Sequence, residues 1–113
     1  MRKQMIENAA FDVATQVRAV EDTIDTALAE IAELQGRMIH AHSVSGVGIA
    51  VDQNSFEYLA AALQNLIGAR GGMAHCHRAL VEAKQNVPGL RTVGFGDTDP
   101  CPKTGHADLR VVA

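Results

Sequence analysis

Apolar residues recur in steps of three and four along the first part of the chain. The stripe consists of Ile6, Ala10, Val13, Val17, Val20, Ile24, Ala27, Ile31, Leu34 and Met38. A repeat of this kind, sustained over several heptads, is typical of an amphipathic helix that packs lengthwise against other helices. Ala14, Leu28 and Ala32 widen the stripe, which favours a helical bundle over a narrow two-stranded coil. The pattern predicts a first helix over about residues 4–42.

A second apolar pattern with helical spacing follows a glycine-containing stretch. Its members are Phe56, Leu59, Ala60, Leu63, Leu66, Ile67, Met73, Ala74, Leu80 and Val81. Asn54 with Glu57 three residues later resembles a capping box, and Pro88 with Gly89 is typical of a helix end. We therefore predict a second helix over about residues 55–86. Residues 43–55 are interpreted as an apolar-lined loop, with a short extended segment as the alternative; they lack the spacing and the lysine of a phosphate-binding loop.

The C-terminal segment, residues 88–113, is rich in glycine and proline and has no helical period. Its two runs "LRTVGF" and "LRVVA" have the composition of strands and would form a short β-hairpin. The alternative is irregular coil that packs on the helices or on a partner. The predicted organisation is thus a helical hairpin over residues 1–87 and a non-helical extension over residues 88–113.

The two helices predict an all-α fold, a long antiparallel helical hairpin. The chain is 47% hydrophobic but only 4% aromatic, so its core consists mainly of aliphatic side chains, which suit closely packed helices. A hairpin buries only one face of each helix against the other. We therefore expect self-association, most simply a homodimer that forms a four-helix bundle.

Two polar residues interrupt the apolar face of the second helix. Arg70 and His77 lie near the middle of that face, where a buried arginine requires an acceptor. In an antiparallel hairpin Arg70 comes level with about Asp25, and His77 with residues 15–22. We predict a polar layer of Arg70, His77 and Glu21, with Asp25 as a further member, within the hairpin or between subunits. It is interpreted as a register device; the alternative is an anion-binding or proton-transfer site.

Glycines occupy the centre of the second helical pattern. Gly68, Gly71 and Gly72 each weaken a helix by about 1 kcal/mol relative to alanine. Gly68 and Gly72 lie four residues apart and share a face. We predict either a bend or close packing of another helix against this pair.

The run His75-Cys76-His77 suggests a metal or thiol site, but helical geometry argues against it. Residues two apart on a helix point to nearly opposite sides, and no potential ligand stands three or four residues from either histidine. His77 alone remains a candidate ligand, through groups from another element or subunit. Cys101, between two prolines, is the candidate reactive thiol. No cofactor and no catalytic residue are predicted, which makes an enzyme the less favoured class.

The distribution of charge reduces the number of functional classes that fit the sequence. The net charge is −3, from 10 basic and 13 acidic residues, and no basic cluster suits a nucleic-acid backbone. The sequence shows neither a membrane-spanning apolar run nor a signal peptide, so we expect a cytoplasmic protein. The favoured function is a structural, assembly or protein–protein interaction module, whose extension also docks a partner. The alternatives are a metal- or anion-binding bundle that uses His77 and Arg70, and a small helical regulator of nucleic acid.

Overall fold

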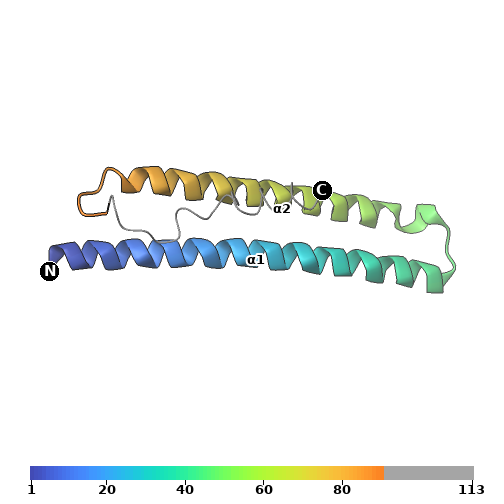
Figure 1. Ribbon diagram of the computed structural model, residues 1–113. Helices are drawn as coiled ribbons and strands as arrows, with labels where there is room; N and C mark the ends of the chain where they lie inside the picture. The colour runs from blue at the N-terminus through green and yellow to red at the C-terminus, as the bar shows by residue number, and fades with distance from the viewer. Residues whose placement is uncertain (91–113) are drawn as a thin grey trace, which may run out of the picture. The chain divides into compact units, whose positions relative to one another are not determined.

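The computed structural model describes residues 1–90, which form two long α-helices and no strand. Helix α1 spans Arg2–Ser45 and helix α2 spans Ile49–Lys84 (Figure 1). The prediction of an all-α, two-helix hairpin is confirmed. The predicted β-hairpin of the extension and Cys101 both lie outside the described residues.

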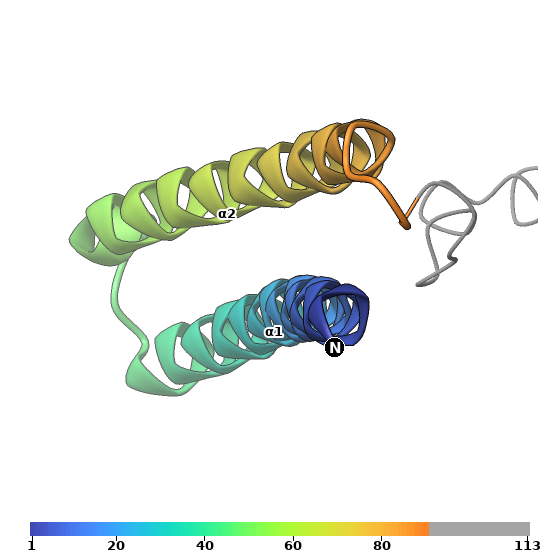
Figure 2. The same cartoon turned by 90° about the vertical axis from the view of Figure 1, so that its left-hand side faces the viewer.

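The chain divides into two compact units, each of which contains a piece of both helices. One unit combines Met1–Ala19 with the chain from Gly72 onward, and the other is Val20–Gly71. Within each unit the α1 and α2 segments run side by side in opposite directions, as Figures 1 and 2 show. The turn between the helices belongs to the second unit.

The connection between the helices is much shorter than the predicted loop. α1 continues to Ser45, and α2 begins at Ile49, six residues before the predicted start at Ser55. The interpretation of residues 43–55 as a loop or extended segment is therefore wrong, and Asn54 lies inside α2 rather than at its cap. The cause is Gly46, whose φ of +70° ends α1 in the left-handed conformation that favours glycine.

Local hydrogen bonds hold this three-residue turn. The Gly46 amide donates to the carbonyl of His42 at 3.3 Å, and the Ser45 hydroxyl donates to the same carbonyl at 2.8 Å. The Val51 amide then donates to the carbonyl of Gly48 at 3.1 Å, which starts the new helix. Asp52 stands in the first turn of α2, where a carboxylate complements the positive end of the helix dipole. These bonds satisfy backbone groups that a helix end otherwise leaves unpaired.

α2 ends at Lys84, and a series of tight turns carries the chain back toward α1. The amides of residues 85, 86 and 87 each donate to a carbonyl three residues earlier, at 3.0–3.1 Å. Gly89 then adopts a φ of +89°, a conformation that side-chain-bearing residues rarely adopt. This turn directs Leu90 inward, where only 4% of its surface is exposed.

Packing between the helices is shallow. Val17 and Leu90 are the only buried residues among residues 1–90, and no side chain in this range is fully buried. Other apolar positions of both helices are half-buried, whereas Val13, Leu34 and Ile67 of the predicted stripes are 47–54% exposed. On α2 we call one half-buried row the seam; it consists of six apolar residues and one histidine, namely Phe56, Leu59, Leu63, Leu66, Met73, His77 and Val81. The predicted apolar stripes thus face each other, but a large part of their surface stays open.

Neither α1 nor α2 combines the length and the apolar character that a helix needs to cross a membrane.

Candidate functional site

An ion pair joins the two helices within Val20–Gly71. The Nε–H of Arg70 donates to Oδ1 of Asp25 at 2.7 Å. This is the level at which an antiparallel hairpin places the two residues. The side chains are 61% and 55% exposed, so in the single hairpin the pair lies at the surface. Whether it becomes part of a buried layer depends on what covers it.

The electrostatics of this pair keep Arg70 permanently charged. The hydrogen bond to Asp25 and then the charge of Asp25 raise the pKa of Arg70 above its ordinary value; desolvation opposes them, and the charge of Glu21 adds a smaller increase. A raised pKa means that the contribution of the Arg70 charge to stability is fully present below the ordinary pKa of arginine and is lost only as the pH rises beyond it, in strongly alkaline solution. The pair is therefore constant across the physiological pH range.

The structure places His77 apart from this ion pair. Arg70 and Asp25 belong to the unit Val20–Gly71, whereas His77 belongs to the unit that combines Met1–Ala19 with the chain from Gly72 onward. Glu21, in contrast, lies one turn from Asp25 on α1 and is half-buried. Arg70, Asp25 and Glu21 thus belong to one level of the hairpin, and His77 belongs to another.

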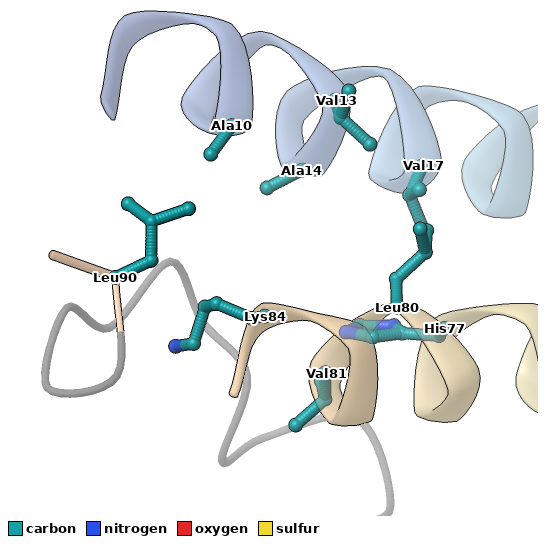
Figure 3. A pocket seen from close by; sticks show the side chains of 9 residues that line it. All are labelled: Ala10, Val13, Ala14, Val17, His77, Leu80, Val81, Lys84 and Leu90. Atoms are coloured by element: carbon teal, nitrogen blue, oxygen red, sulfur yellow. The ribbon is translucent and has the colours of Figure 1, made fainter. Parts of the chain in front are cut away.

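His77 lines a small apolar cleft in the unit that contains both chain segments 1–19 and 72–90. The cleft has a volume of about 190 Å³. Figure 3 shows the side chains around it: Ala10, Val13, Ala14, Val17, His77, Leu80, Val81, Lys84 and Leu90. Two nitrogen-bearing side chains, His77 and Lys84, contribute to an otherwise apolar lining, and no carboxylate from residues 1–90 lines the cleft. The arrangement suits an apolar group with a negative end better than a metal cation.

The potential metal ligands do not gather within the part of the chain that the structure describes. No group of three or more His, Cys, Asp or Glu side chains is placed to hold an ion in residues 1–90. Cys76 is exposed, and His77 is half-buried in the cleft. A metal site at His77 would therefore require ligands from a second chain or from residues beyond 90.

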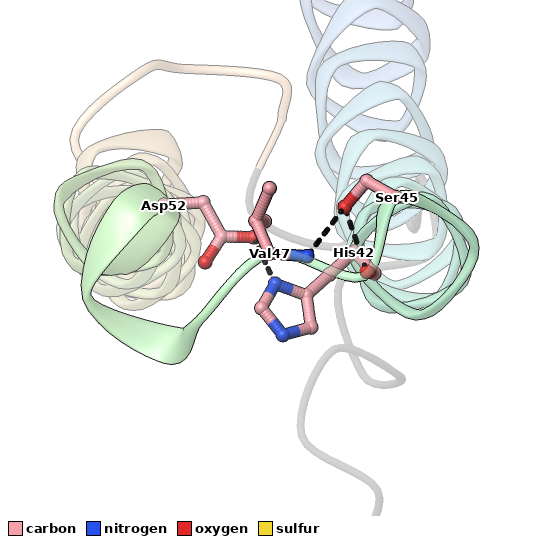
Figure 4. A network of polar contacts seen from close by, with 4 residues as sticks. All are labelled: His42, Ser45, Val47 and Asp52. Atoms are coloured by element: carbon pink, nitrogen blue, oxygen red, sulfur yellow. Dashed lines mark hydrogen bonds and ion pairs between the residues drawn. The ribbon is translucent and has the colours of Figure 1, made fainter.

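A second polar contact closes the turn between the helices, and the sequence did not indicate it. Nδ1 of His42 lies 2.9 Å from Oδ2 of Asp52, with side chains 26% and 28% exposed. Figure 4 shows this contact beside the Ser45 hydroxyl, which donates to the carbonyl of His42 and accepts a bond from the Val47 amide at 3.5 Å. The predicted loop over residues 43–55 includes Asp52, whereas the structure places Asp52 in the first turn of α2. Its position shortly after two glycines was the available signal.

Substitution of Asp52 by alanine is expected to destabilise the hairpin by about 1 kcal/mol. The change removes a partly buried hydrogen bond to His42 and a favourable charge at the start of α2. Thermal unfolding followed by circular dichroism measures this loss. In the double variant with His42→Ala, the second substitution should add little, since both residues serve one contact. Full additivity of the two losses would contradict the contact.

Gly68 and Gly72 make no close contact in the hairpin. A Cβ atom built on either residue would meet no side chain or distant backbone within 4 Å among the described residues. α1 therefore does not pack closely against this pair, and α2 passes through it as one helix. Close packing by another chain stays a prediction.

Alanine at Gly68 and Gly72 is expected to stabilise the protein by about 1 kcal/mol for each substitution. The space around both residues is open, and alanine has the higher helix propensity. Urea unfolding at a fixed protein concentration measures the gain. A loss of stability accompanied by weaker self-association would instead show that a second chain packs on the glycines.

Several large apolar side chains surround the turn in exposed positions. Val44, Ile49 and Val51 are 71–75% exposed, and Val47 is 41% exposed. Contiguous exposed apolar groups are typical of interaction surfaces in soluble proteins. The turn thus adds to the open apolar surface that the shallow helix packing leaves.

No family model matches this chain, and no characterised protein and no solved structure is significantly similar to it. The class that the fold and these contacts define is a two-helix hairpin with incompletely covered apolar faces.

Proposed function

We propose that the protein is a structural, assembly or protein–protein interaction module that acts by pairing its open helix faces, most simply as a homodimer with four helices. One observation carries this proposal: two long helices with matching apolar stripes bury only Val17 and Leu90 among residues 1–90. Burial of one leucine, isoleucine or valine side chain contributes roughly 1.5–3 kcal/mol. A second apolar face that covered the half-buried seam would therefore bury the rest of these side chains and add to the free energy of unfolding.

The available surface is large enough for a stable interface. A helix of 36 residues, such as α2, is about 54 Å long at 1.5 Å per residue. With a contact width of roughly 10 Å, two such helices present about 1,000 Å², and a stable interface buries about 800 Å² per partner. A second copy is the simplest partner, because its open helix faces have the same length and the same spacing of apolar residues as those of the first copy.

Light scattering coupled to gel filtration tests this proposal. The expected mass at micromolar concentration is twice the chain mass of 12.0 kDa. A mass of 12 kDa across the accessible concentration range would contradict self-association. If the chain alone has a monomeric mass and a defined partner is recovered with it, the open faces pair with another protein and not with a second copy.

The cleft beside His77 supports a second candidate function, the binding of a small amphipathic anion. The part of its lining that residues 1–90 form is apolar except for His77 and Lys84 and includes no carboxylate. Calorimetric titration with octanoate, compared with octanol, tests this candidate. Binding of octanoate that Lys84→Gln weakens would support it, and equal binding of both compounds would leave only a hydrophobic surface.

Docking through residues 88–113 and a cytoplasmic location remain predictions. So does a nucleic-acid role, which the acidic charge balance of −3 disfavours.

A further inference from the structure

Arg70 interrupts the seam of α2 at one regular position. It follows Leu66 by four residues and precedes Met73 by three, which is the spacing of the seam itself. Leu66 and Met73 are half-buried against α1, whereas the side chain of Arg70 is 61% exposed. A charged group thus stands in the row of side chains that a second copy would cover.

The guanidinium of Arg70 has more donors than the single hairpin contact uses. It carries five N–H groups, and the bond to Asp25 engages the one on Nε. The other four lie on a side chain that is 61% exposed and therefore accessible to solvent. A partner that covers the pair must offer acceptors in place of solvent, since an unpaired buried charge is strongly unfavourable.

A second copy supplies those acceptors at the matching level. Asp25 lies near the middle of α1 and Arg70 lies within one turn of the middle of α2, from the bounds of the helices. In a dimer with two-fold symmetry whose helices overlap along their length, the central levels of both copies meet. The four carboxylates of Asp25 and Glu21 then surround two guanidinium groups. A shift by one heptad would instead bury each Arg70 among apolar seam residues.

We propose that Arg70, Asp25 and Glu21 of two copies of this chain form one shared charged layer at the centre of their interface, and that this layer fixes the register of the dimer. The inference rests on the proposed function, because it needs a second copy on the open face. The layer acts by excluding other registers: Arg70 keeps the bond to Asp25 of its own chain, but a shifted register separates it from the carboxylates of the second copy and leaves its remaining N–H groups buried without acceptors.

The first experiment compares two arginines that are both exposed in the single hairpin. Arg37 pairs with Glu33 at 3.2 Å with side chains 77% and 63% exposed, and both residues lie on α1 one turn apart. Sedimentation of Arg70→Ala and Arg37→Ala variants should give a dimer dissociation constant about a hundredfold higher for the former and unchanged for the latter. Circular dichroism at a concentration where each variant is dimeric checks that the helices are retained.

The second experiment tests whether the layer is shared between copies. Arg70→Glu and Asp25→Arg variants should each associate poorly, because one dimer has only carboxylates at the layer and the other has excess cations. An equimolar mixture should form a heterodimer at least tenfold tighter than either variant alone, since its layer regains the original charge balance. The Arg37→Glu variant is the matched control: it reverses a charge at a position outside the seam, and it should associate as the wild-type chain does.

The outcomes separate this inference from the proposed function. If the wild-type chain dimerises and Arg70→Ala behaves like Arg37→Ala, or mixing brings no recovery, the shared layer is refuted while self-association stands. If the wild-type chain is monomeric, both are refuted. If Arg70→Ala does not fold, the Arg70→Met variant keeps most of the side-chain volume: weaker association, or association in more than one register, supports the layer, and an unchanged dissociation constant refutes it.

Discussion

Replacement of Leu63 by glutamate is expected to abolish self-association and to remove most of the helical signal. Leu63 is half-buried in the seam, between Leu59 and Leu66. Under a second copy it becomes fully buried, and a charge there has no partner, which costs several kcal/mol. A hairpin with only two buried residues among residues 1–90 has little other stability to offset this loss. Light scattering and circular dichroism on the same sample measure both effects.

Tyr58→Glu is the matched control for this substitution. Tyr58 lies on α2 close to Leu63 in sequence, but it points away from the seam and is 77% exposed. The same glutamate at this position should leave the mass and the helicity unchanged. If Tyr58→Glu disrupted the assembly and Leu63→Glu did not, the outer face of α2 would be the covered one, and the proposed interface would be wrong.

Truncation of Leu90 to alanine is expected to destabilise the protein by about 3 kcal/mol. Leu90 is 4% exposed and closes one end of the cleft beside Val17, so its removal both exposes apolar surface and enlarges a cavity. Chemical unfolding followed by circular dichroism gives the loss.

Leu80→Ala provides the comparison in the same cleft. Leu80 also lines the cleft, but it is 38% exposed and lies within a helix, where alanine is favourable. We expect a loss below about 1 kcal/mol. Equal losses for Leu80 and Leu90 would show that the turn after α2 does not hold Leu90 as described.

Register was predictable from the sequence although the turn was misplaced. Asp25 and Arg70 lie almost equally far from Gly48 along the chain, and an antiparallel pair of helices of equal rise must bring such residues level. The turn itself was mispredicted because two signals competed. The Asn54–Glu57 pair resembles a capping box, whereas Gly46 ends α1 eight residues earlier through its positive φ.

The degree to which the helix faces are buried could not be predicted from the sequence, for a different reason. An apolar stripe reports which face of a helix is covered, but not how many other helices cover it. The spacing of Arg70 matches the apolar row, but its side chain is 61% exposed in the single hairpin, and its burial in a polar layer stays a prediction. His77 has the spacing of the same row, but its surroundings are the cleft that Leu90 also lines. Leu90 lies beyond the end of α2, so the helical pattern of the sequence could not predict this cleft.

The central claim is that a second copy completes the core of this hairpin. Thermal unfolding by circular dichroism at protein concentrations from about 1 to 100 μM tests it most directly, because stability that comes from association depends on concentration. We predict a melting temperature that rises steadily with concentration, with helicity lost on dilution. A melting temperature and a helical content that stay constant over this range, together with a mass of 12 kDa, would contradict the claim.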